Sequence, residues 1–239
     1  MEKINYLFGY DNLKIYQHDD MFKFSIDSIL LPNFVTLLNK SKKILDIGTG
    51  NAVIPLILST KINCQIDGVE IQKKSFLLAK KTVELNNLNK QINLINDDIK
   101  NYSKKIETDF YDTITCNPPF FKISDTSKKN KLEEKSLARH EINLNLDDIM
   151  KIAKKILKNN GNIAIVHRTE RLIDIVDTMK KNNIEPKKIQ FVYSNKSKPS
   201  NILLIEGTKN GKPGCKILPP LYIHNEDGSY TNQLYEYIR

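Results

Sequence analysis

Four short apolar runs of the chain, each predicted to be a β-strand, end in a polar side chain that can bind a ligand. These residues are Asp46, Glu70, Asp98 and Asn117. Ligands of open parallel sheets bind beyond the carboxyl ends of the strands. We therefore expect the four side chains to gather in one crevice. Four such tips in succession are less frequent by chance than any single one.

A glycine turn follows the first of these acids. Gly48, Thr49 and Gly50 lie between the strand that ends at Asp46 and an apolar helix expected at 52–59. Glycine suits positions where the backbone has a positive φ or where a ligand approaches the main chain closely. The order strand, glycine turn, helix is the first half of a nucleotide-binding βαβ unit, although an ordinary strand–helix turn has the same pattern.

The details of this turn narrow the choice of ligand. A dinucleotide-binding turn has a third glycine where this chain has Val53, and a phosphate-binding Walker loop needs Gly-Lys-Ser/Thr, which the sequence lacks. A ligand without phosphates fits better, with its amino group held by Asp46. Glu70 follows 24 residues after Asp46, and an acid about 20 residues on suits the two hydroxyls of a ribose.

The tetrapeptide Asn117, Pro118, Pro119 and Phe120 is the most specific feature of the chain. The Asn117 side-chain oxygen and the Pro118 carbonyl are two neutral acceptors that can hold both N–H groups of a planar amine and aim its lone pair at an electrophile. The prolines fix this geometry, and Phe120 offers a stacking face worth about 1–3 kcal/mol. The acceptors stabilise positive charge on the nitrogen, so no carboxylate base is needed. A proline-rich turn is the alternative.

The apolar periodicity predicts an α/β fold with a doubly wound, mostly parallel seven-stranded sheet and helices on both faces. The expected strands are 43–46, 65–70, 92–96, 111–116, 163–166, 188–193 and 201–207, and 13–17 is a short edge strand or hairpin. The expected helices are 26–38, 52–59, 72–86, 146–158 and 171–181, the fourth ending at 159–161. We expect a single domain over 1–239, with a long polar loop at 121–145.

The composition favours one cytoplasmic domain. The chain has 239 residues and 40% hydrophobic residues, no signal pattern, and no apolar run near the roughly 18 residues of a membrane span. Its three cysteines are far apart, which indicates neither disulfides nor a metal site. The net charge of +9 favours a nucleic-acid partner. Only four of the 37 basic residues are arginines, so drift in an AT-rich genome also explains the lysines.

The glycine turn and the two acids resemble the S-adenosylmethionine (SAM) site of Rossmann-type class I methyltransferases. The resemblance implies that the Asp46 region lies by the methionine part of SAM and that Glu70 binds its ribose. Asp98 then accepts a hydrogen bond from the adenine amine, although an Asx turn explains that residue equally simply. Ile71 and Ile99, which follow these acids, belong to the same candidate set, and so does Asn117. The family often has a further glycine where this chain has Ala52.

Over nearly its whole length the chain resembles the bacterial tRNA1(Val) N6-adenine methyltransferases, which methylate the adenosine at tRNA position 37, beside the anticodon. The matching stretches are 17–28, 46–55, 117–120, 138–141 and 219–221. The resemblance implies SAM as cofactor, S-adenosylhomocysteine as product and the anticodon stem-loop as partner. It also implies that residues 1–40 close over SAM, which favours a ligand role for Phe24, Ser25 or Asp27. Capping of the helix at 26–38 is the alternative for Asp27.

The same resemblance assigns candidate RNA contacts to the polar segment after Asn117. Phe120 would stack on the target base after the base is turned out of the anticodon loop. The remaining candidates are basic: Lys128, Lys129, Lys131, Arg139 and His140, with Lys135 nearby. The lysines would meet the backbone of the anticodon stem. An Arg-His pair also occurs commonly as surface or capping residues.

Three other functions fit parts of the sequence. The first is methylation of another amine, in DNA, in ribosomal RNA or in a protein glutamine, although a glutamine enzyme would not need the basic face. The second is a non-catalytic RNA-binding protein, against which intact Asp46, Glu70 and Asn117 argue. The third is a nicotinamide oxidoreductase, which Val53 disfavours.

Overall fold

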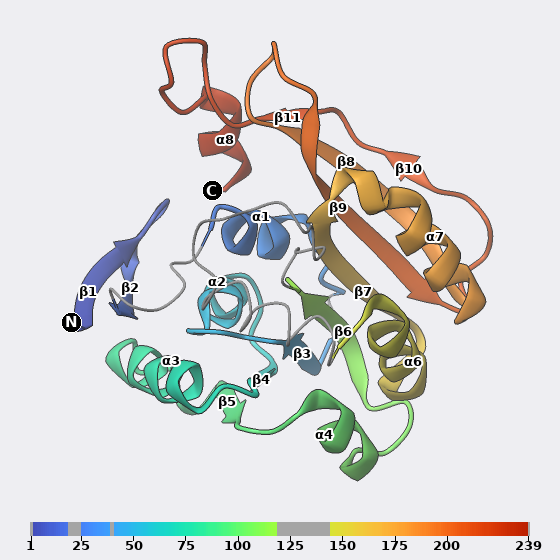
Figure 1. The fold of residues 1–239 in the computed structure, drawn as a ribbon. Coiled ribbons are helices and arrows are strands. Elements are labelled where there is room, and N and C mark those ends of the chain that lie inside the picture. Colours follow the sequence, from blue (N-terminus) through green and yellow to red (C-terminus); the bar gives the residue numbers. More distant parts are fainter. Residues whose placement is uncertain (1, 19–24, 39–40, 119–143, 239) are drawn as a thin grey trace, which may run out of the picture.

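A computed structural model describes residues 2–18, 25–38, 41–118 and 144–238 (Figure 1). A separate hairpin consists of β1 (Glu2–Leu7) and β2 (Tyr10–His18). The main sheet contains β3 (Lys43–Ile47), β4 (Gln65–Val69), β5 (Ile92–Ile95), β6 (Tyr111–Cys116), β7 (Leu157–Arg168), β8 (Ile184–Tyr193), β9 (Ser200–Lys209), β10 (Lys216–Ile217) and β11 (Leu221–Tyr222). The helices are α1 (Asp27–Phe34), α2 (Val53–Lys61), α3 (Lys73–Leu85), α4 (Ile99–Lys105), α6 (Leu146–Ile156), α7 (Leu172–Lys181) and α8 (Asn232–Tyr237), with a 3-10 turn at Thr169–Arg171.

The strand order of the main sheet is β10-β8-β9-β7-β6-β3-β4-β5, and β11 pairs with β8. All of its strand pairs are parallel except those that β9 makes with β7 and β8. The seven longer strands are those that the sequence predicts, so the expected fold class is confirmed. The two-residue strands β10 and β11 extend the sheet beyond that prediction.

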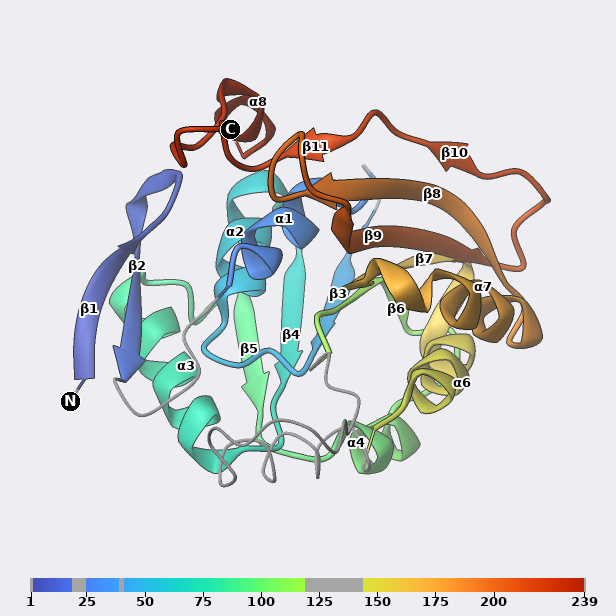
Figure 2. The ribbon, with the colours of Figure 1, turned by 45° about the horizontal axis from the view of Figure 1, so that its top comes forward.

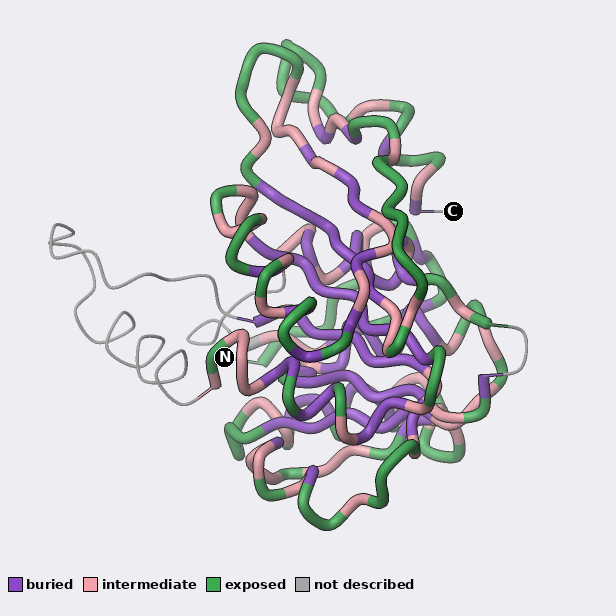
Figure 3. The backbone as a smooth tube through the Cα atoms, turned by 90° about the vertical axis from the view of Figure 1, so that its right-hand side faces the viewer, coloured by how far each residue is buried: buried purple, intermediate pink, exposed green. Residues whose placement is uncertain are grey.

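Side chains alternate between the two faces of the sheet, and each face is covered by its own group of helices. Along β7, Ala164 and Val166 pack with α1 and α2, whereas Ile163 and Ile165 pack with α6 and α7. In Figure 3 the buried segments run through the middle of the molecule and the exposed ones lie at its periphery. Because successive residues of a strand face opposite sides of the sheet and both sides are covered by helices, nearly every residue is apolar. Such a strand therefore appears in the sequence as a continuous apolar run.

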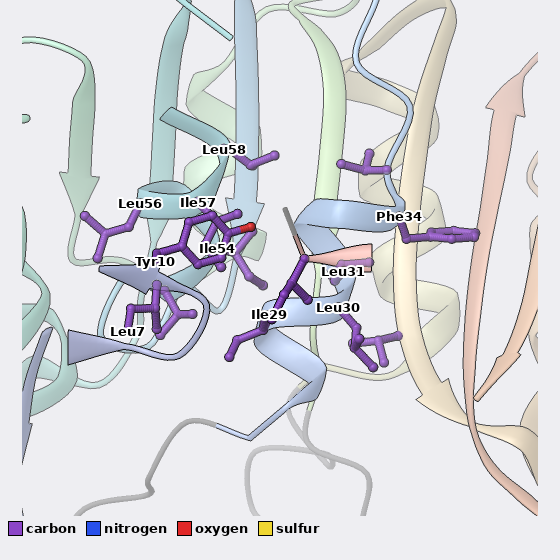
Figure 4. Close-up of a cluster of buried hydrophobic side chains, with 14 of the residues drawn as sticks. Leu7, Tyr10, Ile29, Leu30, Leu31, Phe34, Ile54, Leu56, Ile57 and Leu58 are labelled. Carbon is purple, nitrogen blue, oxygen red and sulfur yellow. The ribbon is translucent and has the colours of Figure 1, made fainter. Parts of the chain in front are cut away.

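The hairpin and the first two helices form one packed unit. Leu7 and Tyr10 of the hairpin lie against the cluster that α1 and α2 build from Ile29, Leu30 and Leu56, among others (Figure 4). Hydrogen bonds tie β2 to α3, where the Tyr16 N–H donates to the Thr82 hydroxyl over 3.1 Å and the Lys14 N–H donates to Asn86 over 3.0 Å. This packing fixes the position of α1 relative to the sheet.

Several elements differ from the sequence-based expectation. The first expected helix, 26–38, ends at Phe34. The fourth expected helix ends at Ile156, and β7 begins at Leu157, so the expected stop at 159–161 lies inside a strand. Helices α4 and α8 were not expected. In the described part of the chain, no helix is both long and apolar enough to cross a membrane.

Candidate active site

The register of the sheet brings the predicted strand tips to the same level. Asp46 pairs with Thr115 of β6, and the last residue of β3 pairs with Val69 of β4. Val69 in turn pairs with Ile95 at the end of β5. The arrowheads of β4 and β5 lie at one edge of the sheet in Figure 2. Glu70, Asp98 and Asn117 therefore follow strands that all end at this edge.

Asp46 is a fully buried carboxylate with an unfilled hydrogen-bonding position. Its exposed fraction is 0%, and the Thr115 hydroxyl donates to Oδ1 over 2.7 Å. Oδ2 is also buried and accepts no hydrogen bond from the described residues. Burial raises the pKa of Asp46 to about 7, although the Thr115 hydrogen bond and the nearby Thr49 hydroxyl oppose the rise, and the negative charge of Glu70 adds to it. A cationic amino group beside Oδ2 would restore the charged form.

The glycine turn leaves space on the side away from the protein. Gly48 and Gly50 have φ values of +69° and +57°, and a Cβ at either position would have no atom within 4 Å. The N–H groups of Gly48 and Thr49 donate to the Val69 carbonyl over 2.9 and 3.1 Å. The hydroxyl of Thr49 is buried and makes no hydrogen bond of good geometry with the described residues, but it lies close enough to the Asp46 carboxylate to lower the pKa of that group. The turn is thus held by hydrogen bonds to the end of β4, and no protein atom lies against its two glycines on the other side.

Ala52 adopts the left-handed conformation, which favours glycine. Its φ is +69° and its ψ is +27°, at the N-cap of α2, and it is fully buried. A non-glycine residue in this conformation costs roughly 1–2 kcal/mol. A glycine at this position would adopt the same backbone without this cost.

Glu70 is buried and is held by two backbone donors. The Gly50 N–H donates to Oε2 over 2.9 Å, and the Gln72 N–H donates to Oε1 over 2.8 Å. A carboxylate has about four acceptor positions, so both oxygens can also accept hydrogen bonds from ribose hydroxyls. Ile71, directly after it, is 46% exposed, so an apolar side chain is accessible at this strand tip.

Asp98 has the structural role that the sequence left open as an alternative. Its Oδ1 accepts a hydrogen bond of 2.8 Å from the Lys100 N–H and caps α4. The neighbouring Asp97 forms an ion pair of 2.7 Å with Lys105. Ile99 is 4% exposed and packs into the core between α4 and the sheet. The cofactor roles of Asp98 and Ile99 stay predictions.

Asn117 lies directly beyond β6 with its side-chain amide held from α1. Its Nδ2 donates to the Ser28 hydroxyl over 3.0 Å, and both side chains are partly buried. No described residue donates to its Oδ1, which is the acceptor that an amine substrate would use. The following Pro118 is buried. Pro119 and Phe120 lie outside the described residues.

Asp27 lies at the start of α1, next to Ser28. The N-cap of this helix is Ile26, so Asp27 lies inside the first turn rather than at the cap. The Ser25 hydroxyl donates to its Oδ2 over 3.0 Å, whereas the buried Oδ1 has no partner among the described residues. Burial raises the pKa of Asp27, and the Ser25 hydrogen bond and the positive charge of Arg168 oppose that rise.

The structure adds three residues to the site that the sequence did not single out. They are Thr115, which binds Asp46; Ser28, which binds Asn117; and Arg168, whose charge acts on Asp27. The only sequence signal for Ser28 is its place in the matching stretch 17–28. The candidates Phe24, Lys128, Lys129, Lys131, Arg139 and His140 lie outside the described residues.

These groups fit the expected cofactor. Two carboxylate oxygens, on Asp46 and Asp27, and the Thr49 hydroxyl are buried and make no hydrogen bond of good geometry in the described structure. Such groups are costly unless a ligand pairs with them. Together with the open glycine turn, they suit an amino acid part and a sugar joined in one molecule, as in SAM. Within the described residues no group of three or more His, Cys, Asp or Glu is placed to hold a metal ion.

Comparison with known proteins gives a consistent result. A relative from Cytophaga hutchinsonii, named tRNA1(Val) (adenine(37)-N6)-methyltransferase, is 26% identical over 235 residues, 98% of this chain and 97% of its own. A relative of the same name from Trichodesmium erythraeum is 31% identical over 167 residues, 69% of this chain and 68% of its own.

Solved structures confirm the fold. A predicted O-methyltransferase from Agrobacterium tumefaciens is similar with a TM-score of 0.69 and 14% identity, over 89% of this chain and 95% of that one. Geranyl diphosphate methyltransferase, solved in complex with SAM, is similar with a TM-score of 0.55 and 8% identity, over 76% of this chain and 84% of that one.

The sequence family decides the enzyme class. The model of the family described as methyltransferase small domain matches residues 14–191, which is more than half of the chain. The match includes the glycine turn and the four polar strand tips. The expected class, a methyltransferase that uses SAM, is thereby confirmed. The chain belongs to the methyltransferase small domain family.

Proposed function

We propose that this enzyme transfers a methyl group from SAM to the exocyclic N6 amine of an adenosine in tRNA, at position 37 beside the anticodon of a valine tRNA. The observation that carries the proposal is the position of Asn117. Its amide oxygen has no described donor, and it follows a strand that ends level with the buried acid Asp46 and the glycine turn. The names of relatives that span nearly the whole chain support the choice of adenine and tRNA.

The chain's own residues account for binding and for activation of the amine. SAM, when bound, supplies an electrophilic methyl group. Asp46 pairs with the amino group of the cofactor, the glycine turn passes along it, and Glu70 accepts hydrogen bonds from the ribose. Asn117 Oδ1 and the Pro118 carbonyl accept the two N–H groups of the adenine amine, which aims the nitrogen lone pair away from the ring. Positive charge on the nitrogen is stabilised by these fixed dipoles.

Recognition of the RNA is assigned to the segment after Pro118 and to the basic surface. The adenosine is turned out of the anticodon loop at a cost of a few kcal/mol and stacks on Phe120. Lys128, Lys129 and Lys131 meet the phosphates of the anticodon stem, and Arg139 with His140 contacts a phosphate or base near the site. Residues 1–40 form one domain with the rest and close over SAM. The enzyme acts in the cytoplasm.

The test is incubation of the purified enzyme with radiolabelled SAM and total RNA of the source organism, followed by mapping of the labelled nucleoside. We expect label in N6-methyladenosine at position 37 of a valine tRNA. Label in ribosomal RNA, or label only when DNA or a glutamine-containing protein is supplied, would retain the methyltransferase class and refute the tRNA substrate. A version of the enzyme with Asn117→Ala is the control for contaminating activity.

A further inference from the structure

The order of the strands divides the edge that carries the site into two halves. The groups assigned to the cofactor follow β3, β4 and β5, and the acceptor for the amine, Asn117, follows β6. The next strands along the sheet are β7, β9 and β8. With SAM bound over the first half, the part of an RNA that adjoins the target base has the second half beside it.

The segments that leave β7 and β8 in this second half are rich in cations. Because β9 is antiparallel to both neighbours, β7 and β8 run in the same direction and end on the same side of the sheet. Arg168 ends β7 and Arg171 follows it, and these are two of only four arginines in the chain. The turn between β8 and β9, 194–199, contains Lys196 and Lys198 and no acid. These four residues are the β7–β8 basic surface.

Hydrogen bonds join the two segments of the β7–β8 basic surface. The hydroxyls of Thr169 and Ser200 lie 3.0 Å apart. The first directly follows Arg168, and the second comes two positions after Lys198. Ser200 is also paired with Tyr193 across β8 and β9, which fixes the base of the turn. The arginines and the lysines therefore lie on neighbouring parts of one packed unit.

The arginine end of this surface lies close to the catalytic strand tip. Cys116, the residue before Asn117, pairs with Ile165 of β7, three positions before Arg168. Burial raises the pKa of Asp27 and the charge of Arg168 opposes that rise, so the guanidinium lies near the first turn of α1. The same turn contacts the side chain of Asn117. A phosphate next to the target nucleotide would thus have a cation nearby.

The lysine end of the surface is accessible to a partner. Lys196 and Lys198 are both exposed, and neither forms an ion pair with a described residue. At the arginine end, Asp174 forms an ion pair of 2.6 Å with Arg171, and its side chain is 58% exposed. A guanidinium has five N–H donors, so Arg171 can keep this acid and bind a phosphate as well.

We propose that the β7–β8 basic surface binds backbone phosphates of the substrate RNA beside the nucleotide that enters the site. The inference rests on the proposed methylation of an RNA, and it adds a contact on the side of Asn117 opposite to the cofactor. Contacts to phosphates fix the position of a nucleic acid and carry no sequence information. This surface therefore orients the RNA and does not select the base.

The first experiment changes only the lysines, which contact no group assigned to catalysis. Lys196→Gln combined with Lys198→Gln removes two phosphate contacts, so the dissociation constant for tRNA should rise at least about fivefold. The logarithmic slope of binding against salt should become shallower by about 1.4–1.8 units. The affinity for SAM and kcat at saturating tRNA should not change. Filter binding at several salt concentrations, calorimetry and labelled-methyl transfer measure these quantities.

The control is Lys90→Gln combined with Lys212→Gln, which changes the net charge by the same amount. Both lysines are exposed, and they precede β5 and follow β9, at the opposite edge of the sheet. We expect this pair to leave the salt slope as it is in the parent. Equal effects of the two pairs, or an unchanged slope for Lys196 and Lys198, would overturn the phosphate contact.

The second experiment raises the charge of the surface instead. Asp174→Asn removes the acid that pairs with Arg171 and should tighten tRNA binding about threefold at low salt, the scale of one exposed charge pair. Asp109→Asn is the control, because Asp109 is 57% exposed and forms an ion pair of the same 2.6 Å with Lys209, and it precedes β6 at the opposite edge. A damaged fold does not produce tighter binding. No gain relative to this control would overturn the assignment of Arg171.

These binding measurements need no turnover, so they separate the surface from the proposed function. If the parent enzyme labels no RNA, the proposed function fails, and bulk tRNA as the probe still decides whether the surface binds phosphates. If the parent labels tRNA and the two lysine pairs behave alike, the surface is refuted and the methyl-transfer assignment is untouched.

Discussion

At the scale of single residues, Asp46 is arranged for binding rather than for stability. It is fully buried, one of its oxygens is unpartnered, and burial raises its pKa from the usual 3.8 to about 7. A raised folded-state pKa means that folding favours the protonated acid. The protonated acid therefore contributes to the free energy of unfolding. This contribution is complete below the unfolded pKa and is lost as the pH rises to about 7, where the folded state also ionises.

The first prediction follows from the loss of stability that the raised pKa of Asp46 causes at high pH. Asp46→Asn removes the ionisable group but keeps an oxygen for the Thr115 hydroxyl. We expect the variant without ligand to be more stable than the parent at pH 8, by up to about 4 kcal/mol, and the advantage to shrink at pH 5. The variant should nevertheless bind SAM at least about tenfold more weakly, since a charge-assisted contact is lost. Thermal unfolding at both pH values and calorimetry measure the two effects.

An Asp46→Asn variant that unfolds at a lower temperature at pH 8 would show that the carboxylate is paired in the free protein. Thr115→Val is a useful comparison because it removes the 2.7 Å hydrogen bond to Asp46 Oδ1 without removing the acid. It should raise the pKa further and move the pH dependence of SAM binding to higher pH.

The second prediction separates catalysis from cofactor binding at Asn117. Asn117→Ala removes the acceptor for the amine, so methyl transfer should fall by at least about 100-fold, the usual effect of losing one preorganised catalytic hydrogen-bonding group. The dissociation constant of SAM should change little, because Asp46 and Glu70, the main proposed cofactor contacts, lie at the ends of the other strands β3 and β4. Single-turnover transfer of labelled methyl and calorimetry check the two parts. Near-normal turnover would remove Asn117 from the mechanism.

At the scale of elements, α1 is joined to the sheet by a buried polar network at its far end. Glu206 on β9 is 4% exposed and accepts hydrogen bonds from the Thr36 N–H over 2.6 Å and the Thr36 hydroxyl over 2.7 Å. Asn162 on β7 donates to the same carboxylate over 3.1 Å, and Lys188 on β8 lies 3.5 Å away. Three strands and the segment after α1 therefore meet at one carboxylate.

The third prediction tests this anchor. Glu206→Ala leaves buried donors and the Lys188 charge without their partner, which typically costs about 3 kcal/mol or more. For a chain of this size the melting temperature should fall by roughly 6–12 °C. Glu226→Ala, at an exposed glutamate in a turn, is the control and should change the melting temperature by less than about 2 °C. Equal melting temperatures for both variants would mean that α1 is held by its apolar face alone.

The sequence predicts the strands that are buried on both faces. It does not predict elements that have few apolar residues or that follow the previous element without a break in the apolar pattern. The long strands are covered on both faces and so appear as apolar runs. Helix α4 has the sequence Ile-Lys-Asn-Tyr-Ser-Lys-Lys, with too few apolar residues to show a period. At the start of β7 the apolar pattern hides the boundary instead. Leu157 continues the apolar spacing of the preceding helix, so the sequence predicts a helix that is too long.

The candidate site was predictable to the same extent. Asp46, Glu70 and Asn117 end strands, and parallel strands must bring their ends together, so chain order alone places them. Ser28 and Thr115 act through partners that are distant in the sequence, and only the packing of α1 and the register of β3 with β6 reveal them. Their residue types carry no signal by themselves.

At the scale of the whole molecule, the two ends of the described chain are joined. Phe8 in the hairpin turn packs on Tyr230 with ring centroids 4.7 Å apart, and on Tyr235 in α8. Gly9 has a φ of +81°, and a Cβ there would lie 2.5 Å from Ile238. The C-terminal segment thus holds the hairpin, and the hairpin in turn packs against α1 and α2 beside the site.

The net charge of +9 belongs to this scale as well, and it yields the last prediction. If Lys128, Lys129 and Lys131 contact tRNA phosphates, changing all three to glutamine should raise the dissociation constant for tRNA at least about tenfold. It should also flatten the dependence of binding on salt by up to about two units of logarithmic slope, because each phosphate contact releases a counterion. SAM affinity should not change. Filter binding at several salt concentrations measures both effects.

A control with the same change in net charge distinguishes contact from general attraction. Lys90, Lys212 and Lys216 are exposed and precede or begin strands β5 and β10, at the edge of the sheet opposite to the polar tips. Their triple glutamine variant lowers the positive charge by the same amount far from the site. If both triples weaken tRNA binding equally, the basic surface acts as a diffuse field and the loop has no specific part. If only the loop triple does, the RNA lies across the edge where Asp46, Glu70 and Asn117 end their strands.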